Sequence, residues 1–445
     1  MNLIYDIKDK PKFGQIVLFA IQQLLAIMAA TIAVPAVINS GAGTDMSASA
    51  ALFGAGVGSI VYLLFTKSSS PVFLGSSFAF IGSMLSAFGG AASMAVGYAG
   101  LFIGALIAGL VYVVLAIVVK FCGVKWIDKL MPPVIIGPTV AIIGLSLAGN
   151  AIGDLMSSSV EGGSVYVCVI CGLVTLAVTM LCSTYGKKMM KLIPFIIGIL
   201  AGYLVASIFA IIGNATGNSA LVVINYSAFS EMGSFISLPD FNFAKSDFSG
   251  VTASYLLTLF VAYAPVAFVV FAEHLADHKN LSYIIGKDLL EDPGLTRTLL
   301  GDGVGSAVGA FFGGCPNTTY GESIACGAIT RNASTISIWG AAIACIIFSL
   351  ITPLVAFLET VPSCVMGGVC IALYGFISAS GLKMLQPVDL NKNRNLFVAS
   401  VIFIVGVGGM TLTFGQVEIR TVACALILGI LTNVMLSGEK EEEDA

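Results

Sequence analysis

Two acidic residues in this chain follow long uncharged stretches, where a charge is costly. Glu273 follows the apolar run 268–272, and Glu322 follows the sequence Asn-Thr-Thr-Tyr-Gly at 317–321. A charged acid at the centre of a bilayer costs ~2.5–3.5 kcal/mol on insertion scales, so such residues are usually functional. Because loss of water disfavours a charged carboxylate, each acid offers both hydrogen bonds to a polar solute and a place to carry a proton. The alternatives are a helix cap for Glu322 and, for Glu273, a boundary marker beside the polar residues 274–278.

The composition places these acids in a membrane. The chain of 445 residues is 58% hydrophobic and 10% charged, with a mean hydropathy of +1.00, whereas a soluble domain carries about 25% charged residues. A spanning helix needs ~20 mostly apolar residues. Such runs predict an all-α polytopic membrane protein with fourteen segments at 14–38, 48–66, 71–90, 97–119, 132–153, 164–183, 193–213, 252–274, 298–314, 317–331, 336–358, 361–382, 395–411 and 415–437.

The basic residues support this count of segments. Cytoplasmic loops collect Lys and Arg. With fourteen segments and a cytoplasmic N-terminus, every Lys and Arg except Lys245 and Arg420 falls on the cytoplasmic side. If either of the two weakest segments, 71–90 and 317–331, did not cross the membrane, every later loop would lie on the opposite side. Lys and Arg would then no longer collect on the cytoplasmic side. We therefore predict a multi-pass protein of the cell membrane with both termini in the cytoplasm.

The chain also divides into two halves. The long polar stretch 214–250 falls midway, and seven segments on each side make the halves inverted relative to each other. Met-Pro-Pro-Val-Ile-Ile-Gly at 131–137 is weakly similar to Val-Pro-Ser-Cys-Val-Met-Gly at 361–367, which lies 230 positions later. Pro35 and Pro265 share that offset. The pattern predicts two inverted seven-segment repeats.

The two weakest segments contain stretches that favour extended backbone. Gly-Ser-Ser-Phe at 75–78 corresponds to Asn-Thr-Thr-Tyr at 317–320. Extended backbone leaves polar groups unpaired, which costs several kcal/mol each in lipid, so it survives only inside protein or along a polar cavity. Paired interruptions of this kind indicate a substrate site near the midplane of a transporter, with half-helices that point their N–H groups at it. Re-entrant structural loops are the alternative.

Other polar residues are less informative. Gln22 and Gln23 lie in the first segment, where they could take part in helix packing as well as in a functional site. Tyr374 suits stacking on a flat ligand as well as core packing. Asp302 lies near the predicted start of the ninth segment, where it would cap a helix.

The sequence contains none of the common nucleotide-binding or hydrolase motifs. An enzyme or an ATP-driven pump is therefore disfavoured, and an ion gradient should supply the energy of transport. With only two histidines, and with cysteines mostly inside apolar runs, we expect the cysteines to be small apolar residues rather than metal ligands. Neither a cofactor nor a nucleic-acid partner is expected.

Several motifs resemble those of the uracil permeases in the nucleobase/ascorbate transporter family. They are Ala-Glu-His at 272–274, Lys-Asp-Leu-Leu-Glu-Asp-Pro-Gly at 287–294 and Pro-Asn-Thr-Thr-Tyr-Gly-Glu at 316–322. The stretches 75–80 and 373–375 match the same family, and the similarity extends from the first segment to the last.

The resemblance implies an architecture and a function. A core domain would comprise residues 1–130 and 251–360, and a gate domain residues 131–250 and 361–445, with short β-strands in the third and tenth segments. The protein would be a homodimer formed mainly through its gate domains. It would import uracil with protons, by alternating access of the core against the gate.

The resemblance also assigns residues to the site. Glu273 and Glu322 would hydrogen-bond the uracil ring, and the backbone N–H groups of Phe78 and Gly321 would bind its carbonyl oxygens. The remaining site residues would be Ser77, Tyr320 and, from the gate side, Tyr374. Proton coupling would involve Glu273, Glu322 and Asp277.

Four positions depart from the family pattern, namely Gln23, Asp277, Ser323 and Ala325. The family usually has His in place of Gln23, Asn in place of Ser323 and Gly in place of Ala325. Asp277 stands where close uracil permeases have His. A xanthine or other purine carrier of the same family is therefore an alternative, although Glu322 stands where purine carriers usually have Gln. An anion exchanger or channel with related inverted repeats is a second alternative, which two acids in the site disfavour.

Overall fold

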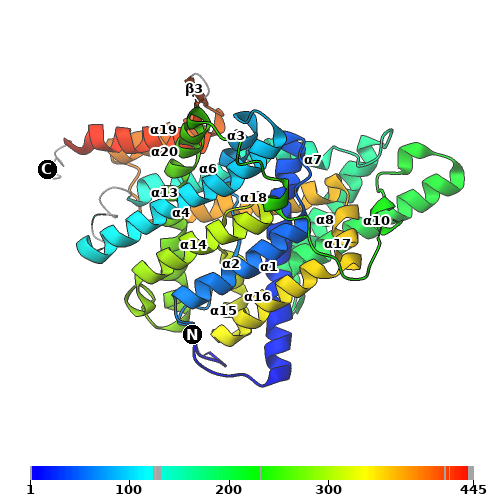
Figure 1. The fold of residues 1–445 in the computed structure, drawn as a ribbon, viewed down its shortest axis with the longest axis horizontal. Helices are drawn as coiled ribbons and strands as arrows, with labels where there is room; N and C mark the ends of the chain where they lie inside the picture. The colour runs from blue at the N-terminus through cyan, green and yellow to red at the C-terminus, as the bar shows by residue number, and fades with distance from the viewer. Residues whose placement is uncertain are drawn as a thin grey trace.

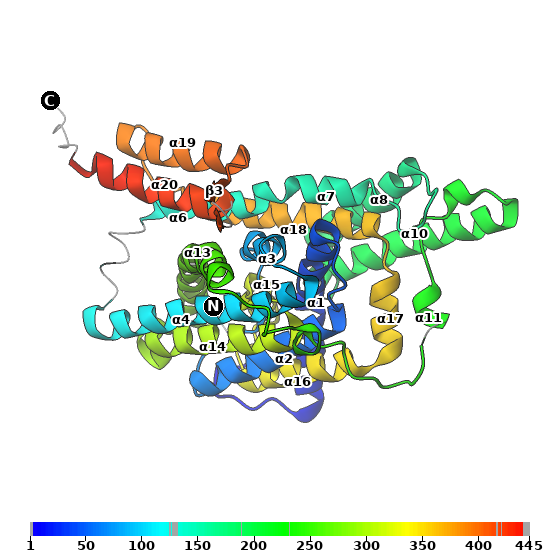
Figure 2. The ribbon, with the colours of Figure 1, turned by 45° about the horizontal axis from the view of Figure 1, so that its top comes forward.

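The computed structural model describes residues 3–123, 126, 132–187, 189–230, 232–414, 417–419 and 421–438. Arg420 and the acidic tail, both used in the sequence-based topology, lie outside these ranges. The described part is mostly helical and arranged in two layers (Figures 1 and 2).

The first layer contains two sets of helices that are far apart in sequence. Its long helices pack closely: α14 lies against α2 and α4, and α16 lies against α1 and α2. The helices of this layer are α1 (Phe13–Ala42), α2 (Ala48–Phe65), α3 (Ile81–Gly89), α4 (Met94–Cys122), α13 (Ala253–Ile285), α14 (Leu295–Gly313), α15 (Gly321–Thr330) and α16 (Thr335–Leu350).

The second layer is likewise assembled from two parts of the chain. In it, α18 packs against α6 and α8, while α19 packs against α6 and α20. Its helices are α6 (Pro133–Ser146), α7 (Ala148–Leu155), α8 (Val165–Tyr185), α10 (Pro194–Thr216), α18 (Ser363–Met384), α19 (Asn393–Val407) and α20 (Thr421–Met435). The layers meet where α1 and α13 contact α6, α10, α18 and α20.

Short elements connect or extend these layers. Two pairs of antiparallel strands are present, β1 (Leu74–Ser76) with β2 (Asn317–Thr319), and β3 (Leu412–Phe414) with β4 (Val417–Ile419). The short helical elements are α9 (Met189–Leu192), η1 (Ser219–Leu221), α11 (Ser227–Ser230), α12 (Asn242–Lys245), η2 (Leu290–Gly294), α17 (Thr352–Thr360) and η3 (Leu436–Gly438).

The outer faces of the long helices are apolar. On α4, Leu110 and Val114 are 63% and 58% exposed, and on α10 Leu204, Ile208 and Ile211 are exposed in the same way. Residues spaced by three and four lie on one face of a helix, so these side chains form continuous apolar stripes. Within the described ranges, eight helices are long and apolar enough to cross a membrane. The stripes are therefore surfaces for lipid.

Close helix packing in the first layer depends on small residues. A Cβ atom added at Gly54 of α2 would lie 2.4 Å from the carbonyl oxygen of Gly309 in α14. In lipid, helices associate through close backbone approach rather than through a hydrophobic driving force. Glycine at these positions lets α2 and α14 touch along their backbones. All ten cysteines are free, and nine of them are buried among similar small side chains.

The N-terminal segment and two helix junctions lie on the same face of the molecule. The Ile4 N–H donates to the carbonyl of Arg331 over 2.8 Å, and the Ala333 N–H donates to Tyr5 over 2.9 Å. Lys287, between α13 and α14, forms an ion pair of 2.6 Å with Asp6. The segment before α1, the α13–α14 junction and the α15–α16 junction therefore share a side.

Lys245 is the centre of an ionic cluster between α12 and the loop joining α1 to α2. Its ammonium lies 2.9 Å from Asp45 and 2.6 Å from Asp240. The Tyr98 hydroxyl donates a short hydrogen bond to Asp45. First this hydroxyl and then the Lys245 ammonium hold the pKa of Asp45 below its usual value. The cluster fastens the long loop before α13 onto the first layer.

We expect acid to weaken this cluster. Because the pKa of Asp45 is lowered on folding, its stabilisation is complete above the ordinary pKa of about 3.9 and is lost as the pH falls through the lower folded value. Asp45 is largely exposed, so the contribution should stay below about 1 kcal/mol. Melting temperatures of the wild type and Asp45→Asn should differ at pH 7, and the difference should shrink as the pH falls below about 3.9. A difference that does not change with pH would contradict this interpretation.

Candidate substrate-binding site

The two short strands β1 and β2 pair at the centre of the first layer. Their antiparallel register places Gly75 opposite Thr318. Beyond the strands, the Ser77 N–H donates to Pro316 over 2.9 Å and the Tyr320 N–H to Phe73 over 3.2 Å. The two extended stretches therefore satisfy each other's backbone groups, which makes them tolerable away from water.

A short helix begins after each strand. Helix α3 starts at Ile81, and α15 starts at Gly321. The N–H groups of Phe78 and Gly321 find no acceptor within the described part of the chain. Two backbone donors with no protein partner are therefore available beside the strand pair, next to the positive ends of two helix dipoles.

Three carboxyl groups gather beside these donors. Glu273 and Asp277 lie one turn apart on α13, and Glu322 lies in the first turn of α15. All three are partly exposed, and their charges are close enough to repel one another. The Thr319 hydroxyl donates to Asp277 over 2.7 Å, which ties α13 to β2. None of the four ion pairs among the described residues includes these acids.

The position of Glu273 differs from the boundary expected from hydropathy. Helix α13 continues to Ile285, about 18 Å beyond Glu273 at 1.5 Å per residue. The histidines that follow, His274 and His278, are completely buried. Glu273 is therefore an interior residue of a long helix rather than a residue at its end.

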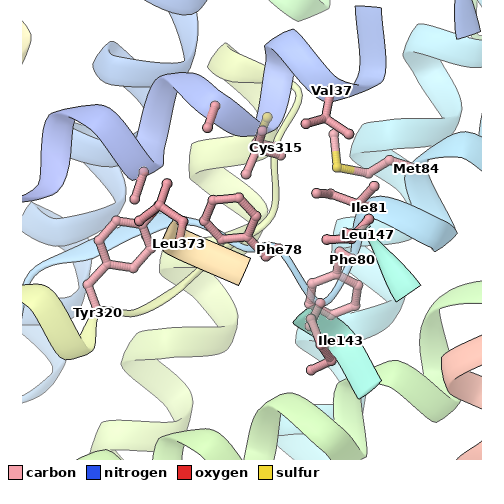
Figure 3. Close-up of a cluster of buried hydrophobic side chains, with 14 of the residues drawn as sticks. Val37, Phe78, Phe80, Ile81, Met84, Ile143, Leu147, Cys315, Tyr320 and Leu373 are labelled. Atoms are coloured by element: carbon pink, nitrogen blue, oxygen red, sulfur yellow. The ribbon is translucent and has the colours of Figure 1, made fainter. Parts of the chain in front are cut away.

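Aromatic side chains close the site on its apolar side. The Phe78 ring lies between Tyr320 and Leu373 on one side and Ile81 and Leu147 on the other (Figure 3). The Tyr320 hydroxyl donates to the Ser76 carbonyl over 2.7 Å. This bond fixes the Tyr320 ring against β1.

Tyr374 approaches this site from the second layer. The ring of Tyr374, on α18, meets the Phe78 ring edge-on with 5.6 Å between centroids. Both side chains are buried. Ser77, next to Phe78, has a buried hydroxyl with no partner among the described residues. The structure thus gathers Ser77, Phe78, Tyr320, Gly321 and Tyr374 around the strand pair, near the three acids.

Two of the unusual positions have structural roles. The Gln23 amide donates to the Ser323 carbonyl over 3.1 Å, which joins α1 to α15. The Ser323 hydroxyl accepts the Phe73 N–H over 3.3 Å, at the start of the extended stretch. Ala325 is exposed on α15. Gln23 and Ser323 therefore hold α15 in place beside the strands.

Sequence reasoning missed a buried polar network next to the acids. His274 Nδ1 lies 2.7 Å from Asp302, and His274 Nε2 lies 3.0 Å from the Thr298 hydroxyl. Asp302 is 1% exposed and lies two turns inside α14, so the expected helix cap is wrong. The i, i+4 spacing of His274 and His278 was the available signal, because it places both rings on one face of α13.

The second histidine has a defined tautomer. His278 Nδ1 faces the His274 carbonyl at 2.8 Å, so it must carry the proton. Nε2 then accepts the Tyr62 hydroxyl at 2.7 Å. His278 therefore connects α13 to α2.

A cavity of about 160 Å³ lies between the two layers, with Phe78 in its wall. Helices α3, α6, α13 and α20 line it, and Ser83, Ser146 and Asn150 contribute polar groups. None of the three acids lines this cavity. Phe78 thus borders a space at the layer interface that is separate from the three acids.

The fold matches that of membrane transporters. The transmembrane domain of a cyanobacterium bicarbonate transporter, BicA, aligns with a TM-score of 0.63 and 14% identity, covering 96% of this chain and 99% of that one. The anion transporter Slc26a9 of mouse, in the inward-facing state, aligns with a TM-score of 0.66 and 12% identity, covering 97% and 69%. These similarities show that the chain shares the fold of these two proteins.

The sequence narrows this class to one family. Residues 14–414 match the Permease family (Xan_ur_permease). Uracil permease of Bacillus caldolyticus is 38% identical, covering 98% of this chain and 96% of the relative. Uracil permease of Escherichia coli (strain K12) is 36% identical, covering 95% and 92%. The chain belongs to the Permease family and is a transport protein of the membrane rather than an enzyme.

Proposed function

We propose that this permease imports uracil across the cell membrane together with protons. The observation that carries the proposal is a central strand pair with two backbone N–H donors and three carboxyl groups. Among the described residues, the donors have no acceptor and the carboxyl groups have no cationic partner. The names of the full-length relatives supply the substrate class.

Uracil matches the chemistry of these groups. Its ring N–H groups are donors that suit the carboxylates of Glu273 and Glu322, and its carbonyl oxygens are acceptors that suit the N–H groups of Phe78 and Gly321. Hydrogen bonds to a charged partner contribute ~1.5–3 kcal/mol each. Ser77, Tyr320 and Tyr374 would complete the site around the ring.

The crowding of acids provides a reason for proton coupling. Glu273, Asp277 and Glu322 repel one another, and a proton on one of them reduces that repulsion. We infer that Glu273 or Glu322 takes up a proton before uracil binds. Asp277, which the hydrogen bond from Thr319 holds in place, would influence how readily these two acids take up the proton. The proton is the coupling ion, and no other cofactor is needed.

Alternating access would come from motion of the two layers. We propose that the layers are the core and gate domains of fourteen segments in two inverted repeats, with β1 and β2 in the third and tenth segments. The Phe78–Tyr374 contact crosses between the layers, and it would break when the layers separate. Both termini would be cytoplasmic, since the face that carries Lys287 and Arg331 also carries the N-terminal segment. A homodimer would form through the gate domains.

The names of the structural neighbours raise anion transport as another function. BicA is a bicarbonate transporter, and Slc26a9 is an anion transporter. Three carboxyl groups that pair with no described cation would repel an anion. The site therefore favours a neutral solute with N–H donors.

Uptake into proteoliposomes tests the proposal. We expect an inward proton gradient to drive accumulation of labelled uracil, a protonophore to abolish it, and excess xanthine to leave it nearly unchanged. Empty liposomes provide the control. Accumulation that follows a sodium gradient would overturn the coupling ion, and strong competition by xanthine would indicate a purine carrier.

A further inference from the structure

A second, smaller cavity lies behind the strand pair. It is enclosed by α4, α13, α14, β2 and the turn before α3, and its volume is about 10 Å³. This is near the smallest cavity that holds one water molecule, ~10–15 Å³. It does not include Glu273, Asp277 or Glu322, so it is separate from the proposed substrate site.

Four polar atoms in the walls of this cavity lack a partner. They are the Tyr112 hydroxyl on α4, Oδ1 of Asp302 and the Ser306 hydroxyl on α14, and Oδ1 of Asn317 on β2. Each of these side chains is at least 95% buried. Unpaired buried polar atoms are rare in native structures, and four around one small space indicate an occupant.

The identity of the four atoms specifies the occupant. The Asn317 amide nitrogen donates to the Gly54 carbonyl over 3.1 Å, which fixes Oδ1 as the acceptor on the cavity side. Oδ2 of Asp302 is engaged by His274, which leaves Oδ1 as a second acceptor. Tyr112 and Ser306 supply two hydroxyl donors. We propose that one water molecule binds here, donating to Asp302 and Asn317 and accepting from Tyr112 and Ser306.

A metal cation satisfies these atoms less well. It would bind four oxygen atoms, but the hydroxyl hydrogens of Tyr112 and Ser306 would then need acceptors elsewhere. Neither hydroxyl has another acceptor among the described residues. A water molecule satisfies all four groups, since it offers two donors and two acceptors.

The water connects the strands to the rest of the first layer. On one side it continues the chain Thr298–His274–Asp302, and on the other it reaches Asn317, which is bonded to α2. β2 is then held from behind by the water and in front by the bond from Thr319 to Asp277. The bound water is a positioning element for β2, whatever substrate the permease carries.

X-ray radiolytic labelling of the purified full-length protein tests this site, because hydroxyl radicals form from water at its place of binding. We expect Tyr112 to be labelled several times faster than Tyr255, which is equally buried, lines neither of the two cavities and has its hydroxyl bonded to the Ala87 carbonyl. Equal protection of both tyrosines would overturn the proposal. So would labelling of Tyr112 that disappears when sodium chloride replaces choline chloride, since sodium would then be the occupant.

The Ser306→Val variant provides an independent test. The substitution would fill the cavity with methyl groups and remove a donor, so Tyr112 should become as protected as Tyr255. Ser349→Val is the matched control, because Ser349 is equally buried on α16 and its hydroxyl is bonded to the Ile346 carbonyl. Labelling of Tyr112 should persist in this control. Persistence in Ser306→Val, with the variant still folded by its melting temperature, would overturn the proposal.

Discussion

Glu322→Gln is expected to weaken uracil binding by about 10- to 150-fold, because the substitution removes one charge-assisted hydrogen bond worth ~1.5–3 kcal/mol. The amide keeps the shape of the side chain but presents an N–H group where uracil needs an acceptor. Uptake of labelled uracil should fall to background. Calorimetric titration of the purified protein measures the loss of affinity directly.

The same substitution should leave the protein folded. Glu322 forms no ion pair among the described residues, and its main structural contribution is to the first turn of α15, where an acid contributes ~0.3–1 kcal/mol. The melting temperature should therefore change little. Glu161→Gln, in the exposed loop before α8, is the matched control and should bind uracil normally. Normal uptake by Glu322→Gln would exclude Glu322 from the site.

The pH dependence of the residual binding separates two roles of Glu322. If Glu322 takes up the coupling proton, binding by the glutamine variant should no longer depend on pH, since the titrating group is gone. If Glu273 takes it up, the weakened binding should keep the pH dependence of the wild type. Titrations at several pH values between about 5 and 8, where proteins are usually most stable, distinguish the two.

The sequence singled out two stretches as a candidate site because unusual backbone leaves a compositional signal. Residues 75–78 and 317–320 are rich in residues that favour strands and poor in strong helix formers, and they interrupt otherwise apolar segments. Glu322 is adjacent to one of them in sequence. These local features predicted extended backbone, each time followed by a short helix, without knowledge of any long-range contact.

Hydropathy failed where polar residues are buried in helices. It ended the eighth segment at residue 274, because Glu273, His274, Asp277 and His278 lower the local average, yet α13 continues to Ile285. It also started the ninth segment too late, since Arg297 lies in the first turn of α14. Asp302 therefore looked like a cap. Its actual partner, His274, lies in another helix, and only the tertiary structure brings them together.

Gly75→Ala is expected to abolish transport and to destabilise the protein. A Cβ atom at Gly75 would lie 2.4 Å from the Tyr320 ring and 3.0 Å from the Thr31 hydroxyl. Tyr320 has little room to move, because its hydroxyl is bonded to the Ser76 carbonyl and its ring is buried. The strands would have to separate, and overpacking of this kind costs ~1–3 kcal/mol. Their separation would also displace the N–H groups of Phe78 and Gly321.

Gly153→Ala is the matched control for this experiment. Gly153 lies in helix α7, and a Cβ atom there would have nothing within 4 Å. Alanine in a helix is favoured over glycine by ~1 kcal/mol, so this variant should be at least as stable as the wild type and should transport normally. Melting temperature and uracil uptake, measured on both variants, check the prediction. Normal uptake by Gly75→Ala would show that the close contact between β1 and Tyr320 is not needed for the site, because transport would then tolerate a shift of the strand pair.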